Sequence, residues 1–496
     1  MPLFGATAQP AEEIGPNGPA APVVPRRTLD PAAEEAGKRR AEAQRPPGPP
    51  SSAEPLAAVF NGLNKAGLSQ TTASPPDTTG AIGPPHYVEM VNGRVGTFSR
   101  ATLAAVSSTP LSTFTGRSNT CDPQVQFDKG AGRWFYAAID CSDVAANFRL
   151  LLGWSKTSDP SNLSTGWCRF QLDTSSTGTN TGLSDYPKLG HNSVNEIIGS
   201  NDFNSLGNFT TARVWMYAKP PNGTTTCAAP FVNFTNPAGG LKNPDGSTMF
   251  TPVPANSVDN PAKGFVTAAH FPAGGVAQTK IALAHVAGTA AAPTFTNDGE
   301  VTVGSYNFPA NVPQPGTTFK LDSSDTRLTQ SVGRRDSAIS VEGIWGQHTI
   351  NGSSERSVVR WYEINPSAKT VRQSGAIAPS GLFAFNGAIS PTNAGTSAVV
   401  INYNVGSSTN RVSVRASSRL STSALNTMPQ PVSTLVTSGS VEPDFTCSST
   451  VACRWGDYAG ASPDMTNSNV VWGSNQLNGP TTSNPAWLTR NFALTP

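Results

Sequence analysis

The sequence has 496 residues, of which 13% are charged, against about 25% in an average soluble protein. Its formal net charge of +2 provides no field that would attract nucleic acid or an anionic membrane, so we expect no nucleic-acid partner. No run of 18 apolar residues occurs, so we also expect no membrane insertion.

Residues 1–70 differ in composition from the rest of the chain. They contain the charged run PAAEEAGKRRAEAQR and the proline-rich run RPPGPPSSAEP. The first favours one exposed helix over residues 31–44, and the second favours extended chain. Such a segment can bury little apolar surface, so we expect a flexible, disordered leader or linker with solvated charges. We see no basic stretch followed by an apolar one, so we expect no signal peptide in the sequence as written.

From residue 71 onward, short apolar runs recur between turn residues. They are rich in Val, Phe, Tyr and Trp, as in HYVEMVN, RWFYAAID, RVWMYAK, GFVTAAHF, SVVRWYEI, SAVVINYN and NVVWGSN. Such runs indicate β-strands, and no helical period persists for long. We therefore expect residues 71–496 to form one all-β domain.

An Asp-led turn precedes a strand in five places. These turns begin at Asp77, Asp122, Asp185, Asp325 and Asp457, and two degenerate copies begin near Thr251 and Phe383. Seven starts recur about every 60 residues, and long strand repeats of this kind are typical of radial arrays. We predict a seven-bladed β-propeller, with six or eight blades as alternatives.

Six cysteines punctuate the domain, and none forms a CxxC pair, which argues against a zinc knuckle or a thioredoxin-like motif. Six cysteines allow 15 connectivities, and proximity along the chain favours the consecutive one. The pairs are then Cys121 with Cys141, Cys168 with Cys227, and Cys447 with Cys453. Disulfides persist in oxidising compartments, so we expect a secreted or cell-surface protein.

The words DPQVQFD, DYPKLG, DTRLTQ, VVRWYEI and GDYAGAS occur in an order that resembles uncharacterised secreted bacterial propeller proteins. These are distantly similar to sialidase and Asp-box propellers. The resemblance covers most of residues 75–496 and implies a propeller and an exported location, but no activity. A strict Asp-box reads Ser-x-Asp-x-Gly-x-Thr-Trp. Here Ser158 and Asp159 precede Gly166 and Trp167 at another spacing, so the sialidase similarity concerns shape.

The five aspartates that begin the repeats are the first candidate site. If each begins the innermost strand of a blade, Asp77, Asp122, Asp185, Asp325 and Asp457 face one end of the channel. A ring of carboxylate oxygens could hold Ca²⁺, which takes six to eight oxygen ligands. The alternative, which we favour, is that each Asp only satisfies backbone N–H groups in its turn.

A set of basic and aromatic residues at the same strand ends is the second candidate. Lys188, Arg327 and Arg454 could bind an acidic ligand such as a sugar carboxylate. A sialidase-like hydrolase would use Tyr186 or Tyr458, and a lyase would use His191 or His348 as its base. In the alternative reading, the cations only neutralise aspartates and the histidines are structural.

Three functions follow from these patterns. The leading one is a propeller that binds a glycan or another protein without catalysis. The second is a carbohydrate-active enzyme at the channel mouth, either a sialidase-like glycoside hydrolase or a polysaccharide lyase. The third is a structural assembly protein in which residues 1–70 join subunits. The sequence leaves the oligomeric state open. An enzyme requires a deep pocket with two or more cations beside a tyrosine, histidine or carboxylate.

Overall fold

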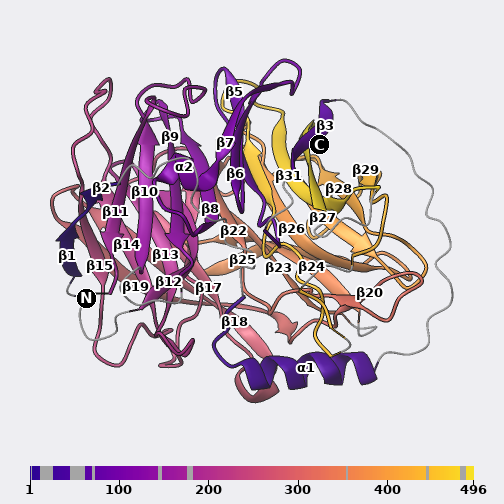
Figure 1. Ribbon diagram of the computed structural model, residues 1–496. Helices are drawn as coiled ribbons and strands as arrows, with labels where there is room; N and C mark the ends of the chain where they lie inside the picture. The colour runs from indigo at the N-terminus through magenta and orange to yellow at the C-terminus, as the bar shows by residue number, and fades with distance from the viewer. Residues whose placement is uncertain are drawn as a thin grey trace.

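A computed structural model gives the fold (Figure 1). It describes residues 1, 3–11, 26–44, 62–69, 73–142, 148–175, 182–352, 356–442, 446–448, 450–480 and 487–496. Within these ranges β-strands dominate, and the helices are α1 (Pro31–Ala43), α2 (Leu111–Thr115) and the short 3-10 helix η2 (Ala273–Gly275). The all-β prediction is confirmed for the described residues.

The strands form antiparallel sheets in chain order, each starting at its inner edge. The first sheet contains β4 (Thr79–Ile82), β5 (His86–Val91), β6 (Arg94–Ser99) and β7 (Ala105–Pro110). The second contains β8 (Thr120–Asp128), β9 (Arg133–Asp140), β10 (Arg149–Ser155) and β11 (Trp167–Asp173). The third contains β12 (Leu183–His191), β13 (Asn195–Phe203), β14 (Phe209–Ala218) and β15 (Phe231–Thr235).

Two further groups join into one eight-stranded sheet because their first strands, β16 and β22, pair in parallel. One group is β16 (Val253–Ser257), β17 (Gly264–Ala269), β18 (Gln278–Gly288) and β19 (Pro293–Tyr306). The other is β22 (Gln330–Asp336), β23 (Val341–Asn351), β24 (Ser357–Asn365) and β25 (Thr370–Ile377).

The chain then forms β26 (Phe383–Pro391), β27 (Val399–Gly406), β28 (Ser413–Arg419) and β29 (Ser433–Thr437). The last sheet contains β30 (Gly460–Pro463), β31 (Val471–Asn478) and β32 (Trp487–Leu494). A short pair, β20 (Val312–Pro313) and β21 (Lys320–Leu321), lies apart from these sheets.

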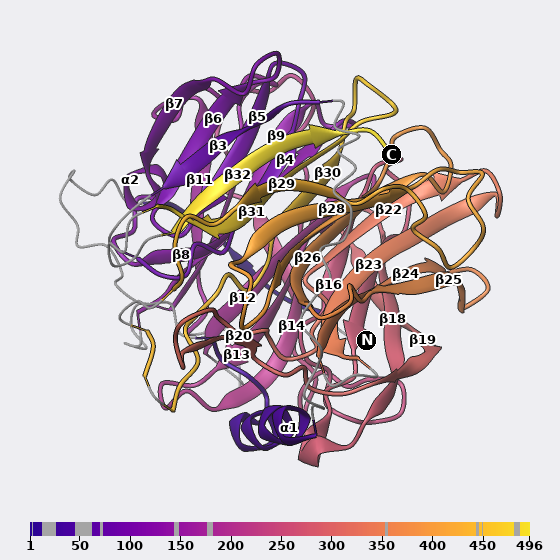
Figure 2. The ribbon, with the colours of Figure 1, turned by 90° about the vertical axis from the view of Figure 1, so that its right-hand side faces the viewer.

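Neighbouring sheets pack face to face through apolar cores, and the last sheet packs on the first. Val88 and Trp134 share the core between the first and second sheets. Tyr87 and Trp472 stack in the core between the last and the first, with ring centroids 5.6 Å apart. The first strands also contact one another in a closed ring, in the order β4, β8, β12, β16, β22, β26 and β30. The sheets therefore surround a common axis, which is the β-propeller arrangement (Figure 2).

This arrangement explains why the strands read as continuous apolar runs rather than alternating ones. A sheet between two others is covered on both faces, so every residue of β9, the run RWFYAAID, is buried. The tryptophans that the sequence shows inside strand patterns are also buried between sheets, which makes them packing residues rather than exposed sugar platforms. They are Trp134, Trp154, Trp167, Trp361, Trp472 and Trp487.

All three consecutive disulfides are present, as predicted from proximity. Cys121 of β8 bonds to Cys141 just after β9, across the hairpin whose turn is residues 129–132. Cys168 in β11 bonds to Cys227 in the loop before β15, which ties the second sheet to the third. Cys447 and Cys453 close a short loop before the last sheet.

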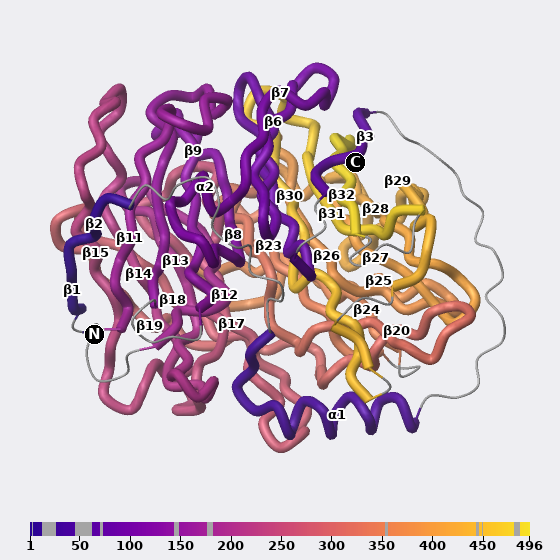
Figure 3. The backbone as a smooth tube through the Cα atoms, in the orientation of Figure 1, coloured from indigo at the N-terminus to yellow at the C-terminus, as the bar shows by residue number. Residues whose placement is uncertain are grey.

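Parts of residues 1–70 are integrated into the propeller, which differs from the expected disordered leader. β1 (Leu3–Thr7) pairs with β15, and β2 (Gln9–Pro10) pairs with β11, so both extend the outer edges of sheets (Figure 3). β3 (Asn64–Ser69) pairs with β32 and supplies the fourth strand of the last sheet. The reason is that open sheet edges offer unpaired N–H and C=O groups that an extended segment can use. Residues 12–25 and 45–61 lie outside the described residues.

Helix α1 forms where the sequence predicts a helix, but one face of it is buried. Asp30 caps its first turn by accepting a hydrogen bond from the Ala33 backbone N–H, at 3.0 Å. Gly37 lets the helix lie directly on Phe308, since a Cβ at this position would lie 2.4 Å from that ring. Glu34 and Lys38 are buried as well, so the charged run is not simply solvated.

Candidate functional site

The five aspartates predicted from the repeats lie where innermost strands begin, and all are buried. Their exposed fractions are 0% for Asp77 and Asp325, 2% for Asp122 and Asp185, and 5% for Asp457. The backbone has the same left-handed conformation at most repeat starts. Asp77, Asp122, Tyr186, Thr251, Thr326 and Asn386 have φ between 46° and 77°. The left-handed residue is the aspartate itself at Asp77 and Asp122 and the residue after it at Tyr186 and Thr326, so the repeated feature is a turn rather than one residue type.

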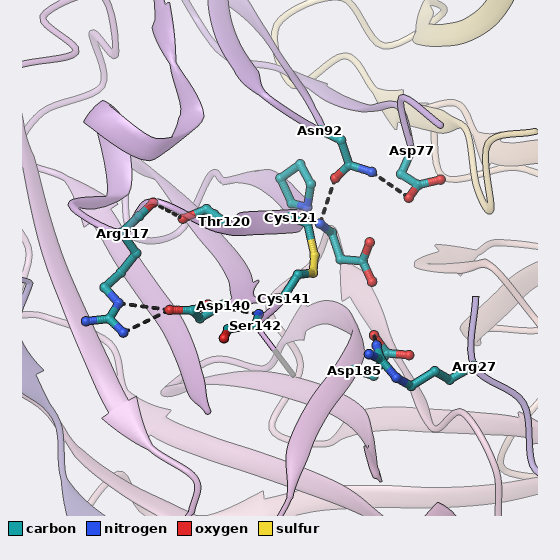
Figure 4. The surroundings of a disulfide bond; sticks show 12 residues. Arg27, Asp77, Asn92, Arg117, Thr120, Cys121, Asp140, Cys141, Ser142 and Asp185 are labelled. Atoms are coloured by element: carbon teal, nitrogen blue, oxygen red, sulfur yellow. Dashed lines mark hydrogen bonds and ion pairs between the residues drawn. A yellow bond between two sulfur atoms is a disulfide. The ribbon is translucent and has the colours of Figure 1, made fainter. Parts of the chain in front are cut away.

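Asp77, Asp122 and Asp457 form one hydrogen-bonded network. Asp77 accepts hydrogen bonds from the Asp457 backbone N–H at 2.6 Å and from the Asn92 side-chain amide at 2.8 Å. The Asn92 carbonyl oxygen accepts from the Asp122 backbone N–H at 2.8 Å. Asn92 thus links the first two sheets beside the Cys121–Cys141 disulfide (Figure 4). The Asp77 carboxylate and the backbone N–H groups of Asp122 and Asp457 thus join the starts of three innermost strands.

Two arginines neutralise aspartates in bidentate pairs. Arg327 donates to both Asp325 oxygens, at 2.6 and 2.5 Å, and Arg454 donates to both Asp457 oxygens, at 2.9 Å each. Burial opposes ionisation of Asp325, but Arg327 outweighs it and lowers the pKa of Asp325 to about 2. Both arginines therefore lie where the sequence places them, already engaged with carboxylates.

Lys188 lies between two aromatic rings inside the cluster. Its Nζ is 3.4 Å from the centroid of Tyr458 and 3.9 Å from that of Tyr186. The ammonium is fully buried and has no hydrogen-bond partner among the described residues. Burial lowers the pKa of Lys188 to about 7, although Asp122 and Asp77 favour its charged form.

The tyrosine hydroxyls of the cluster donate to backbone carbonyls. Tyr186 donates to Asp457 at 3.0 Å, and Tyr458 donates to Pro123 at 3.1 Å. Burial raises the pKa of both tyrosines well above the usual range. In this arrangement both hydroxyls are held as neutral donors.

The two histidines proposed as bases contact other groups. His348 bonds to the Thr326 carbonyl at 2.7 Å and to the Tyr362 hydroxyl at 2.9 Å. His191, at the far end of β12, lies 3.9 Å from Asp128. Burial lowers the pKa of each to about 3, so both are neutral at pH 7.

The sequence interpretation missed the cations that cover the cluster, because they belong to the segment expected to be disordered. Arg26 donates to Asp322 at 2.9 Å and lies 3.3 Å from Asp325 and 4.0 Å from Asp457. Arg27 lies 3.6 Å from Asp185 (Figure 4). The Arg27 carbonyl accepts a 2.7 Å hydrogen bond from Arg327.

Helix α1 follows these arginines and fixes the cover. Lys38 donates to Asp322 at 2.5 Å and to Asn311 at 3.2 Å, and Glu34 pairs with Arg26. The sequence does contain a pattern that could have indicated this cover. Two arginines precede the capping residue Asp30, and Glu34 and Lys38 lie one turn apart on the helix that follows. We call residues 26–44 the cover segment.

The carboxyl groups have markedly different pKa values. Burial and the neighbouring Asp457 raise the pKa of Asp77 to about 7, and burial with Asp185 raises that of Asp122 well above its usual range. Despite burial, Arg26 and Lys38 hold the pKa of Asp322 well below its usual range. The cluster therefore contains both readily protonated and firmly ionised carboxyl groups.

A cavity of about 350 Å³ lies beside the cover segment. Its charged wall comes from α1 and the β20–β21 region, and it is lined by Glu35, Lys38, Arg39, Glu42, Asn311, Thr318, Lys320, Ser448 and residues 450–452. Lys38 lines this cavity and also pairs with Asp322, so the cavity adjoins the buried cluster. Among the described residues, no helix is long and apolar enough to cross a membrane.

Neither a protein-family model nor a curated protein matches the chain. The similar solved structures include a protein of unknown function from Dyadobacter fermentans, with 12% identity and a TM-score of 0.39, covering 76% of this chain and 95% of that one. They also include the GH93 α-L-arabinofuranosidase of Fusarium graminearum in complex with arabinobiose, at 10% identity and a TM-score of 0.38, covering 76% and 93%.

A third is the Dos1 propeller, at 10% identity and a TM-score of 0.39, covering 88% of this chain and 95% of that one. TM-scores this low assign the chain neither to a family nor to an activity. The resemblance to sialidase and Asp-box propellers therefore stays a prediction.

Proposed function

We propose that the chain is a secreted, seven-bladed β-propeller that acts on carbohydrate at the covered end of its channel. The blade count treats the eight-stranded sheet as two blades of four, joined by the parallel contact of β16 and β22. Three disulfides support export, because such bonds are rare in reducing compartments. We keep residues 71–496 as the propeller domain, with β3 added from the preceding segment.

The arrangement that supports a hydrolase is one buried cluster in which the Asp77 carboxyl accepts, among the described residues, only from uncharged donors, whereas Asp325 is paired with Arg327 on both oxygens. Glycoside hydrolysis uses one protonated and one ionised carboxyl group on either side of the bond. Asp77, with a pKa of about 7, fits the proton donor, and Asp325, with a pKa of about 2, fits the ionised partner. Arg327 and Arg454 are already paired with Asp325 and Asp457, so Lys188, which has no hydrogen-bond partner among the described residues, is the cation that fits an acidic sugar.

A substrate must be able to reach the buried carboxyl groups. The five aspartates are 5% exposed or less, and Arg26 and Arg27 lie against them. A substrate therefore reaches the cluster only after the cover segment moves. The adjoining cavity beside α1 is the place where a sugar chain would first bind.

The test compares the full chain with the double variant R26A/R27A on uronate, sialic-acid and arabinan polymers. We expect turnover that rises in the double variant and falls at least about a hundredfold on adding D77N, the size typical of losing an acid catalyst. The matched control is Asp173→Asn, a half-exposed carboxylate at the outer edge of the second sheet, paired with Arg149. This control should leave the rate unchanged.

A second function, binding of a glycan or protein without catalysis, is favoured by the burial of both tyrosine hydroxyls and of the cluster itself. If the full chain binds glycans on an array and the R26A/R27A variant shows no turnover, the protein is a binding protein and the hydrolase proposal is wrong. The same binding experiment, repeated with added Ca²⁺, tests whether the five aspartates bind calcium. If they do, Ca²⁺ should increase glycan binding by the parent chain but not by the D122N variant.

A further inference from the structure

A second polar cluster lies between the third sheet and β19, on segments that the channel site does not use. Asp245 lies in the loop between β15 and β16, His270 directly follows β17, and Glu300 lies in β19. One ligand atom from each of these residues lies within 4.8 Å of the other two. The sequence separates these residues widely, so only the fold brings them together.

His270 is placed between the two carboxylates without a hydrogen bond to either. Its Nδ1 is 3.6 Å from Asp245 Oδ2, and its Nε2 is 3.4 Å from Glu300 Oε1. The residue is 3% exposed, and the buried Nε2 has no hydrogen-bond partner among the described residues. A buried ring nitrogen without a partner costs free energy, so a ligand at this point would remove that cost.

The carboxylates are held in orientations that leave one oxygen of each toward the ring. Asp245 Oδ1 accepts from the backbone N–H and the hydroxyl of Ser247, at 2.9 and 2.6 Å, so Oδ2 faces His270. Glu300 Oε1 also accepts from the Asp245 backbone N–H at 3.2 Å, and its Oε2 lies 4.0 Å from Lys280.

The backbone that carries the histidine is also fixed. The Tyr306 hydroxyl lies within hydrogen-bond distance of the carbonyls of His270 and Lys280, at 3.0 and 2.8 Å, and can donate its proton to either. The His270 N–H in turn donates to the Lys280 carbonyl at 3.3 Å. Fixed ligands of this kind lower the entropy that metal binding would cost.

We propose that Asp245, His270 and Glu300 form a binding site for a divalent transition metal such as Zn²⁺. Ligand atoms about 2.1 Å from a tetrahedral zinc ion lie about 3.4 Å apart, which the pair of His270 Nε2 and Glu300 Oε1 matches, and the ligand atom of Asp245 lies within 4.8 Å of those of the other two residues. Imidazole nitrogen with carboxylate oxygen suits zinc, whereas Ca²⁺ takes oxygen ligands only.

Three protein ligands leave the fourth position of a tetrahedral ion to water, and the 47% exposed side chain of Asp245 leaves a path for the ion to enter. Binding would fasten the loop that carries Asp245 to β19 and to the end of β17. The site stands apart from the proposed carbohydrate chemistry, so its test does not depend on that proposal.

The experiment is isothermal titration of the tag-free full chain, stripped with a chelator, with Zn²⁺ and separately with Ca²⁺. We expect one zinc ion per chain, no binding of Ca²⁺ at this site, and a melting temperature that rises with zinc concentration. Asp245→Asn should weaken zinc binding at least about tenfold, and because Asp245 lies on an exposed loop this variant should fold normally.

The matched control is Asp298→Asn. Asp298 of β19 contacts His285 Nδ1 of β18 at 2.7 Å, close to the proposed site. Among the described residues, no third metal-ligating side chain joins this pair. D298N should bind zinc as the parent does. Co²⁺ in place of zinc should give the visible absorption of a tetrahedral site, and D245N should lack it. Absence of zinc binding, or equal affinity of the parent and D245N, would overturn the proposal.

Discussion

The charge of a buried carboxyl group in this protein depends on whether its first neighbour is an arginine or another carboxyl group. Asp325 has Arg327 on both oxygens, whereas Asp77 accepts hydrogen bonds from a backbone N–H and an asparagine amide and feels both the opposing field of Asp457 and the more weakly acting charge of Arg454. Both are fully buried, so desolvation acts on both in the same direction. The guanidinium decides the difference, and opposite pH dependences of stability follow.

Asp77 should make the native protein less stable as the pH rises. Its folded pKa of about 7 lies above the ordinary value, so its contribution to stability is complete below pH 4 and is lost as the pH rises through 7. Relative to the parent, Asp77→Asn should gain roughly 2–3 kcal/mol of unfolding free energy between pH 5 and pH 8. Urea unfolding at both pH values measures this gain.

Asp325→Asn is the comparison at the same depth. Its folded pKa of about 2 and its ordinary value both lie below pH 5, so its difference from the parent should stay constant between pH 5 and pH 8. That difference should shrink only below pH 4, where the contribution of Asp325 is lost as the pH falls through 2. Parallel pH dependences of the two variants would contradict the assignment of the two charge states.

At the scale of elements, α1 and the arginines before it form a separable unit lying on a charged surface. The helix is held by the ion pairs of Arg26 and Lys38, by the contact of Gly37 with Phe308, and by Ala41, which packs in a core with residues of β20, β21 and β26. Removing a buried cation leaves carboxylates unpaired, which is costly, whereas a surface ion pair contributes little. Replacing Arg26 and Arg27 should therefore loosen the cover segment while the sheets stay folded.

R26A/R27A should increase hydrogen exchange across residues 31–43 by at least about tenfold while exchange in β9 stays at the parent level. The matched control is Arg39→Ala on the same helix. Arg39 is 69% exposed and pairs with Glu35 at the surface, so its loss should leave the exchange of α1 unchanged. Equal exchange in both variants would mean that the arginines do not hold the cover.

The elements of the propeller could be predicted from the sequence, because each apolar run with its turn is a local pattern. The Asp-led turns located the innermost strands, and cysteine proximity identified the disulfides. The cover segment could not be predicted in this way, since its contacts join residues about 300 positions apart, such as Arg26 with Asp322. The amino-acid composition shows that such a segment is charged, but it does not show which distant carboxylates its cations will contact.

At the scale of the whole molecule, the ring of sheets closes by joining the two ends of the chain. The last sheet has three strands from residues 460–494, and β3 supplies the fourth by pairing with β32. Leu68 of β3 lies in the core shared with Trp472 and Trp487, and its N–H donates to Glu89 of the first sheet at 3.0 Å. A single short strand therefore contacts both sheets that meet where the ring closes.

Composition places the start of the propeller domain at residue 71, and β3 lies just before that boundary. Two shortened chains test how much β3 contributes to stability. A chain of residues 62–496 keeps β3, and a chain of residues 70–496 lacks it. Without β3, the edge of β32 is unpaired and Leu68 leaves the core at the point of closure, so the whole ring should weaken.

We expect the melting temperature of the longer chain to exceed that of the shorter one by several degrees, since about 1 kcal/mol corresponds to roughly 1–4 °C in a domain of this size. Calorimetry measures both, and the full chain provides the reference. In the shorter chain, hydrogen exchange should increase first in β31 and β4, which belong to the two sheets that meet where the ring closes. It should increase later in β13, which belongs to the third sheet. Equal melting temperatures of the two chains would show that the ring closes without β3.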